Sequence, residues 1–357
     1  MKRIAFALAI TVFASFASAA PLETYVLDAV GQSSYPTYSR PAPILNFFGP
    51  VGVGIPSIGL GSTSGVGGID RLRTGNSGTI TDAGAASGSG DSSFGSWTAS
   101  GASSANASFG RVGAQGNGTR GNIGDGNTVV TFDAFGKYTE HWAFNDARLN
   151  GAVGTAVLHW RVDGSILSAG PSNTVGVEVN YQRGTDPIRT LMAANIQGTG
   201  TYFTPTTGAG FAGYSISPTA ITGSGVFDTV PIDITFGAGF DFTLGLLAYS
   251  SPRNGTSSST FDSTALLVGI DVYDALGQLV TDFSIVADSG TRYDANGVHF
   301  DDLPPPVTGV PAPETVPLVG LGLAAWWAAR RGRRPTVATH IGGATPSFST
   351  MTRFAAY

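Results

Sequence analysis

The chain contains no cysteine and few charged residues. Charged side chains make up 12% of its 357 residues, and histidine and methionine occur only four and three times. Without cysteine the chain has no disulfide, no thiolate metal site and no cysteine nucleophile, and it cannot carry the lipid anchor of a bacterial lipoprotein. The net charge of −5 is mild and basic residues cluster only near the C-terminus, which argues against a nucleic-acid partner.

Glycine, by contrast, is abundant. The 51 glycines are about twice the usual share of this residue, and they accompany many Ser, Thr, Val and Phe residues. Low charge with this composition favours an all-β protein with many turns over a helical one. Since no disulfide can strengthen the fold, a core of adequate size must hold it, and the region 92–302 is long enough to bury most of its apolar surface.

The first residues have the order of a secretory signal peptide. Lys2 and Arg3 precede an apolar run of about 13 residues, and small residues follow at the cleavage site. Cleavage after Ala19 is preferred, because cleavage after Ala20 would leave a proline beside the scissile bond. Residues 1–19 are therefore predicted to direct export through the Sec machinery.

Residues 20–91 contain little that a core would bury. Prolines are frequent at their start, and residues 61–91 consist mainly of Gly, Ser and Thr. Such a composition is typical of flexible linkers, so this region is predicted to be an irregular lead-in followed by a linker. Its stretch from Gly65 to Asp70 resembles one unit of a calcium-binding Gly/Asp repeat, but the unit does not recur.

Residues 92–302 show the alternation of half-buried strands. Between residues 155 and 163, one face is formed by Ala156, Leu158, Trp160 and Val162, and the other by Val157, His159, Arg161 and Asp163. This strict period of two marks a strand with one buried face. Asp163 and Gly164 form a pair that favours a tight type I′ hairpin, so a turn is predicted there.

Further strands are predicted along the same region. Residues 94–110 indicate one or two strands of low hydrophobicity, and alternating segments follow at 175–181, 240–244 and 266–272. The last segment precedes a turn over residues 274–277 and a return strand that ends near Val286. Short strands without an amphipathic helix between them predict an antiparallel β-sandwich of jelly-roll-like form.

No set of residues has the spacing of a known catalytic or metal-binding motif. His141 and His159 stand beside tryptophans but lack the paired spacing of a zinc site. Most acids of the domain are aspartates in turns, so Glu140 and Glu178 offer the one weak case for a glycosidase pair. The pair at 301–302 (Asp-Asp) offers two carboxylates for calcium, but a solvated strand end is the favoured interpretation. The sequence therefore predicts no catalytic residue, no metal and no cofactor.

Three tryptophans raise the question of a sugar-binding platform, because an aromatic face packs on a pyranose ring. They are Trp97, Trp142 and Trp160. The alternation places Trp160 in the core. Trp142 follows Glu140 and His141, in a polar setting, and is therefore the candidate sugar contact.

A proline-rich spacer and a short apolar segment follow the domain. Residues 303–313 contain repeated prolines, which favour an extended, semi-rigid chain. The apolar segment within residues 314–334 would form a helix of roughly 21 Å, against a hydrocarbon core of about 30 Å. This predicted transmembrane segment consists of Val316, Pro317, Leu318, Val319, Gly320, Leu321, Gly322, Leu323, Ala324, Ala325, Trp326, Trp327, Ala328 and Ala329.

An arginine cluster ends this segment, and it consists of Arg330, Arg331, Arg333 and Arg334. The order of motif, short helix and arginines resembles the PEP-CTERM sorting signal of exported proteins in exopolysaccharide-producing Gram-negative bacteria. The positions that match its Val-Pro-Glu-Pro motif are Val310, Pro311, Ala312 and Pro313, with alanine in place of glutamate. Residues 335–357 continue beyond the arginines as a polar tail, which is predicted to be disordered.

The resemblance implies cleavage by an exosortase-type processing enzyme after transient anchoring in the inner membrane. It further implies a non-enzymatic surface or extracellular-matrix protein, secreted or held at the cell surface and associated with exopolysaccharide or biofilm. A carbohydrate-binding module of the cell envelope is an alternative from a different class, and a secreted hydrolase is a third.

Overall fold

The computed structural model describes residues 21–32, 47, 67–92, 95–121, 128–170, 172–198, 200–205 and 210–299. The predicted signal peptide, proline-rich spacer, sorting motif, transmembrane segment, arginine cluster and tail lie outside these residues. Within them, no helix has the length and apolar character needed to cross a membrane. The described elements are strands and one 3-10 helix, η1 (Gly210–Gly213), and every pair of described strands is antiparallel. The prediction of an all-β, antiparallel fold is confirmed.

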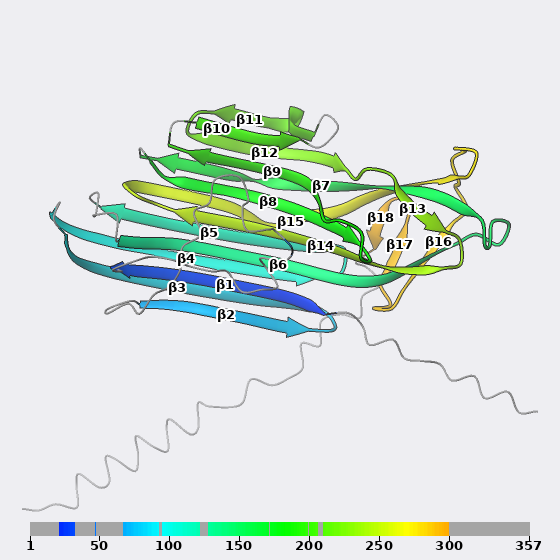
Figure 1. Cartoon of the computed structure of the whole chain (residues 1–357), viewed down its shortest axis with the longest axis horizontal. Helices are drawn as coiled ribbons and strands as arrows, with labels where there is room; N and C mark the ends of the chain where they lie inside the picture. The colour runs from blue at the N-terminus through cyan, green and yellow to red at the C-terminus, as the bar shows by residue number, and fades with distance from the viewer. Residues whose placement is uncertain are drawn as a thin grey trace, which may run out of the picture. The chain divides into compact units, whose positions relative to one another are not determined.

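The first of two sheets contains ten of the described strands (Figure 1). Its spatial order is β10 (Gly200–Pro205), β9 (Arg189–Gln197), β8 (Thr174–Arg183), β14 (Gly239–Ser251), β6 (Thr128–Asn145), β16 (Ser284–Ala287), β17 (Arg292–Asp294) and β18 (Gly297–His299). Two further strands extend it, because β1 (Leu22–Gln32) pairs with β6 and β2 (Gly67–Gly75) pairs with β1.

The second sheet contains eight of the described strands. Its spatial order is β11 (Tyr214–Ser217), β12 (Ala220–Asp228), β7 (Val153–Ala169), β15 (Gly255–Asp274), β5 (Arg111–Gly121), β4 (Gly95–Ser108) and β3 (Thr79–Ser92). A short strand, β13 (Ile232–Thr235), pairs with the beginning of β7. Strands β2 and β3 belong to different sheets but lie side by side at one margin of the molecule (Figure 1).

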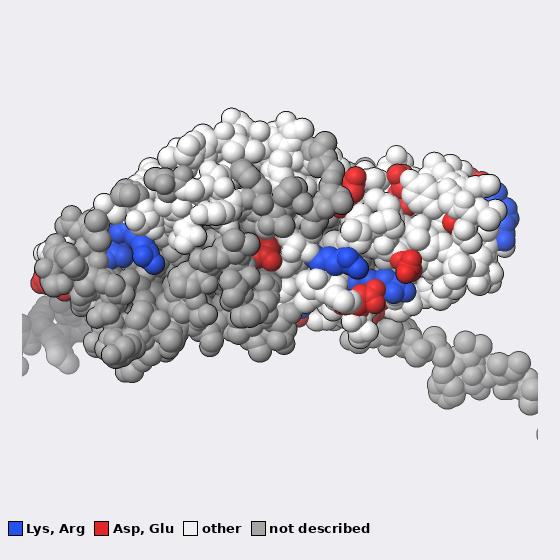
Figure 2. Space-filling model, turned by 45° about the horizontal axis from the view of Figure 1, so that its top comes forward, with Lys and Arg blue, Asp and Glu red and all other residues white. Residues whose placement is uncertain are grey.

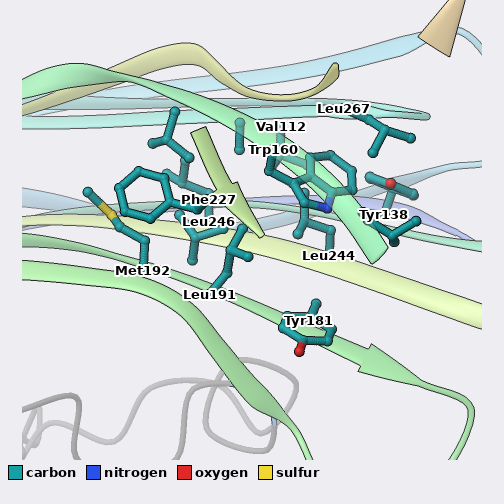
Figure 3. Close-up of a cluster of buried hydrophobic side chains, with 14 of the residues drawn as sticks. Val112, Tyr138, Trp160, Tyr181, Leu191, Met192, Phe227, Leu244, Leu246 and Leu267 are labelled. Atoms are coloured by element: carbon teal, nitrogen blue, oxygen red, sulfur yellow. The ribbon is translucent and has the colours of Figure 1, made fainter. Parts of the chain in front are cut away.

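The main hydrophobic core joins the two sheets, and the side of each sheet that carries it is called the inner face below. Trp160 on β7 is fully buried and stacks on Phe242 of β14, with ring centroids 6.1 Å apart. Tyr138 of β6 lies beside Trp160, as the close-up shows (Figure 3). The predicted alternation on β7 is confirmed, because Ala156, Leu158, Trp160 and Val162 are buried while the intervening residues are partly exposed.

The predicted irregular lead-in and linker over residues 20–91 are wrong where the structure describes this region. Strand β1 lies between β2 and β6 and buries Leu22, Val26 and Val30 completely. The glycine- and serine-rich β3 pairs with β4 along its whole length. The folded body therefore begins at β1 and not at residue 92. The glycine-rich stretch compared with a calcium-binding repeat enters β2 at Gly67.

Small residues form strands here because bulky side chains of neighbouring strands occupy the space above them. A Cβ atom added to Gly90 would lie 2.9 Å from the indole of Trp97, and one added to Gly101 would lie 2.5 Å from the ring of Phe132. Trp97 and Phe132 are buried in one cluster with Val30. Glycine is thus required at these positions because two large aromatic side chains pack against them. The segment has the composition of a flexible linker, but its glycines serve packing and not flexibility.

The predicted hairpin at Asp163–Gly164 is also wrong. Strand β7 continues through both residues to Ala169, and Gly164 lies opposite Gly223 of β12. A Cβ atom on Gly164 would collide with the ring of Phe261 on β15. The glycine therefore provides close approach between strands and not a left-handed turn.

The turn predicted at 274–277 is present, but the strand after it takes a different partner. The Asp274 carboxylate accepts hydrogen bonds from the backbone N–H groups of Leu276 and Gln278, both 2.9 Å long. Beyond a single bridge from Leu279 to Tyr273, the chain leaves the second sheet. It then enters the first sheet as β16, which pairs with β6.

Candidate functional site

A row of polar and aromatic residues crosses the outer face of the first sheet, the face turned away from the main core. The row consists of Asp133, Tyr249, Gly176, Asn195 and Tyr202, on β6, β14, β8, β9 and β10, and each residue is the register partner of the next. Directly paired residues of antiparallel strands point to the same face. These five positions are therefore neighbours on one surface, and we call them the outer row.

Gly176 shapes the centre of the outer row. A Cβ atom at this position would meet the hydroxyl oxygen of Tyr249 and would lie 2.6 Å from the Cβ atom of Asn195. The phenol of Tyr249 consequently reaches across β8 toward β9. Any larger residue at Gly176 would displace it, since the tyrosine and asparagine side chains approach from both sides.

A second set of polar groups adjoins the outer row on β8. The Asn180 amide donates a hydrogen bond of 2.8 Å to the Glu178 carboxylate and another of 3.3 Å to the backbone carbonyl of Phe47. Both side chains are buried. Phe47 packs with Tyr25 and Leu247 in a small apolar cluster on this same face. The outer face of the first sheet therefore has a core of its own, which fixes the polar side chains around it.

Exposure differs along the outer row. Tyr202 is 48% exposed at the edge strand β10, whereas Asp133 and Asn195 are almost completely buried. Tyr202 thus presents an exposed aromatic ring next to Asn195, its register partner, and an exposed ring of this kind can pack on the apolar face of a sugar. The sequence does not predict this row, because its members come from five strands that are far apart in the chain and no local motif links them.

Trp142, the predicted sugar contact, is buried and is not available to a ligand. It is 0% exposed, stacks on Phe242 with a centroid distance of 4.7 Å, and donates a 2.9 Å hydrogen bond from its indole nitrogen to Glu140. The even-numbered residues of β6, Tyr138 to Phe144, all point to the inner face. The polar neighbours in the sequence misled the prediction, because Glu140 is a buried hydrogen-bond partner and not a surface group. Trp97 is buried as well.

Glu140 forms a buried polar network and not half of a catalytic pair. Its carboxylate accepts hydrogen bonds from Trp142, Ser289 and Tyr293. Burial raises the pKa of Glu140, and these three donors offset part of that effect. Glu178 lies on the outer face of the same sheet, so the two glutamates cannot face one substrate between them.

His159 links three strands on the outer face of the second sheet. Its Nδ1 atom lies 2.7 Å from Asp228 of β12, and its Nε2 atom lies 3.2 Å from Asp271 of β15. Burial lowers the pKa of His159, but hydrogen bonds and charge from the two aspartates outweigh it, so the pKa is raised overall. Because both ring nitrogens are occupied, His159 is a cross-strand link and not a metal ligand. No cluster of three metal-binding side chains occurs among the described residues.

A small charged hollow opens between the β8–β9 turn and the segment before β13. It measures about 90 Å³ and is lined by Tyr181, Arg183, Asp186 and Arg189, among others. Arg183 pairs with Asp186 at 3.2 Å, so part of its charge is already neutralised. On the face seen in Figure 2, the charged side chains of the described residues form a few small groups among uncharged ones. The hollow has room for a few waters, and its balanced charges favour no particular ligand.

The predicted sorting motif from Val310 to Pro313 and the acidic pair at 301–302 lie outside the described residues, so the site that the structure brings together is the outer row. No protein-family model matches this chain, and comparisons with curated proteins and with solved structures find no match.

Proposed function

We propose that this chain is an exported, non-enzymatic surface or extracellular-matrix protein that is delivered through a C-terminal sorting signal. The single observation that carries the proposal is the order of elements after the body: a proline spacer, the motif Val310–Pro313, a short apolar segment and an arginine cluster. The described part of the body adds support, since its carboxylates and histidines form structural networks.

The physical basis of the delivery step is hydrophobic mismatch. A helix of roughly 21 Å is shorter than the hydrocarbon core of a bilayer, so it holds the chain only temporarily. The arginines keep the far end on the cytoplasmic side. The extended spacer separates Val310–Pro313 from the folded body, where an exosortase-type membrane enzyme can reach the motif.

For the body, we propose a two-layer β-sandwich of jelly-roll-like form. The support is the shared core, in which aromatic residues of one sheet contact those of the other, as Trp160 and Phe242 do. A sandwich of this kind presents outer faces and edges to solvent. Such a body suits a matrix component, which needs surfaces for association and no enclosed active site.

The test of delivery is the mass of the protein recovered from its host. Protein isolated outside the cell should lack residues 316–357, whereas protein in the membrane fraction should retain them. Finding the C-terminal peptide that ends at Tyr357 on protein released into the medium would overturn the proposal.

A second function, binding of a polysaccharide, is favoured by the exposed Tyr202 at the end of the outer row. Calorimetric titration of the chain with host exopolysaccharide fragments should show binding that Tyr202→Ala weakens about tenfold or more, as loss of a stacking ring does. Tyr273→Ala, a tyrosine on the second sheet, is the matched control and should bind normally. Equal binding by both variants would exclude the outer row as the contact.

A further inference from the structure

The single lysine of the folded body lies on β6, beside an acidic residue of β1. The sequence has two lysines, Lys2 in the predicted signal peptide and Lys137 on β6. Lys137 is the register partner of Glu23 on β1, so both side chains point to the same face of the first sheet. That face is the outer one, because the adjoining residues Leu22 and Tyr138 belong to the main core on the inner face.

These two side chains are in contact and largely withdrawn from water. The Nζ atom of Lys137 lies 2.9 Å from Oε2 of Glu23, and the side chains are 14% and 13% exposed. Nevertheless, Oε2 has no hydrogen-bond partner of normal geometry among the described residues, so Nζ approaches the carboxyl group outside the direction of a hydrogen bond. The carboxyl carbon is one C–O bond of about 1.2 Å from Oε2, which puts Nζ at most about 4.1 Å from it. A nucleophile poised to attack lies roughly 3–3.5 Å from its target.

Aromatic rings form the surroundings of the pair. Gly245 on β14 is the register partner of Lys137 on its other side. A Cβ atom at Gly245 would lie 2.7 Å from the ring of Phe47 and 3.0 Å from the ring of Phe135, so these rings fill the space above the glycine, and they belong with Tyr25 to the apolar cluster of the outer face. In such a site two opposite charges lose hydration, which their attraction only partly offsets. An uncharged product avoids this cost.

We propose that Lys137 and Glu23 condense to an amide, so that an isopeptide bond joins β6 to β1. A proton first passes from the ammonium group to the carboxylate within the pair, which gives an amine and a carboxylic acid. The amine Nζ then attacks Cδ of Glu23. The Nζ–Cδ bond forms, one C–O bond of the carboxyl group breaks, and its oxygen leaves as water with the two hydrogens that the nitrogen gives up. The net charge of the pair is zero before and after, and the step needs no oxidant and no cofactor.

The bond would supply a covalent brace in a chain that has no cysteine and therefore no disulfide. It closes a long loop, from residue 23 to residue 137, and a crosslink across a long loop stabilises a fold mainly by restricting the unfolded chain. It also fixes β1, the first described strand, which follows closely on the predicted cleavage site at Ala19. The inference depends neither on the sorting signal nor on the outer row, so it can fail or hold independently of them.

Mass spectrometry of the purified full chain tests the bond directly. After allowance for the observed N-terminus, the intact mass should be lower by one water than the sequence requires. Trypsin cuts after a free lysine but not after one whose Nζ is acylated. A digest of the unfolded chain should therefore lack the cut at Lys137, and the peptide that contains this residue should be joined to the peptide that contains Glu23. Fragmentation of the branched peptide locates the bond.

Lys137→Arg is the matched control, because arginine keeps the positive charge beside Glu23 but does not condense with a carboxyl group. This variant and Glu23→Ala should both have the full mass of their sequences. A loss of water that persists in Lys137→Arg would come from another site and would overturn the inference. A wild-type chain of full mass that trypsin cuts at Lys137, even after prolonged incubation of the folded protein, would show an ordinary ion pair and would also overturn it. The wild-type measurement decides this even if a variant does not fold.

Discussion

The ring of Phe242 on β14 lies nearly parallel to the indole of Trp160 on β7, with 8° between their planes. One residue belongs to the first sheet and the other to the second. Phe242 also stacks on Trp142, so its ring lies between two buried tryptophans. This aromatic stack is one of the contacts of the shared core that join the two sheets, and its loss should affect the whole body.

Replacement of Trp160 by alanine should lower the free energy of unfolding by about 3–5 kcal/mol, because it removes a buried indole and leaves a cavity. Chemical denaturation at equilibrium measures the change. His159→Ala is the control on the opposite face of the same strand. It should cost about 1 kcal/mol or less, since its partners Asp228 and Asp271 are partly exposed. Similar losses in the two variants would contradict the assignment of faces.

Replacement of Gly118 by alanine should destabilise the body by about 1–3 kcal/mol, because the new methyl group collides with the rings of Phe132 and Pro252. Adding Phe132→Leu should recover part of the loss, since the two sites are in contact. Gly121→Ala is the matched control at the exposed end of β5, where the nearest atom is the Thr98 hydroxyl at 3.3 Å. Thermal unfolding of the four variants tests the prediction. If the losses of stability in the two single variants simply add up in the double variant, the predicted contact between the two sites is contradicted.

The stability of the body should fall as the pH rises from about 4 to about 7. Asp28 is fully buried on β1, and neither carboxylate oxygen has a hydrogen-bond partner of normal geometry among the described residues. Burial raises its pKa from 3.8 to about 7, the Ser103 hydroxyl offsets part of this, and the carboxylates of Asp133 and Asp82 add to it. Because the folded state holds the proton more tightly than the unfolded state, stability is fully present below pH 4 and decreases until the folded pKa is reached.

Asp28→Asn should remove this dependence and stabilise the protein at neutral pH, since an amide needs no proton to stay uncharged. Melting temperatures at pH 4, 6 and 8 give the comparison. Asp82→Asn would not test the same effect, because it would break the ion pairs that Asp82 forms with Arg71 and Arg73. The change in melting temperature of Asp28→Asn between pH 4 and 7 reports all other groups and is subtracted from that of the wild type. If the wild-type melting temperature still rises after this correction, the raised pKa of Asp28 is contradicted.

The C-terminal signal yields a prediction about cell fractions. Changing Arg330, Arg331, Arg333 and Arg334 to serine should weaken the membrane stop, because the positive charges oppose passage of the chain. Changing Pro311 and Pro313 to alanine should instead leave an uncut form in the membrane fraction. Immunoblots of membrane and medium measure both effects. If both sets of variants were secreted and processed like the wild type, the motif would have no role.

Local patterns in the sequence were enough to identify the class of fold. The alternation around Trp160 determined that a strand is present and which residues it buries, because alternation with a period of two is visible in consecutive residues of one segment. The Asp274 turn was equally local, since its carboxylate bonds to residues two and four positions later. The prediction of a sorting signal also rests on contiguous residues, Val310 to Arg334, and it remains a prediction.

Tertiary structure alone decided which segments join the sheets and what their glycines do. Nothing in the β3 sequence distinguishes a strand from a linker, because Gly90 belongs to a strand only where Trp97 occupies the space above it. In the same way, Trp142 and Glu140 stand in a polar stretch of the sequence, yet both are buried and the Trp142 indole donates a hydrogen bond to the Glu140 carboxylate. The outer row exists only after strands distant in the chain have paired, since register across a sheet is a long-range property that no single segment contains.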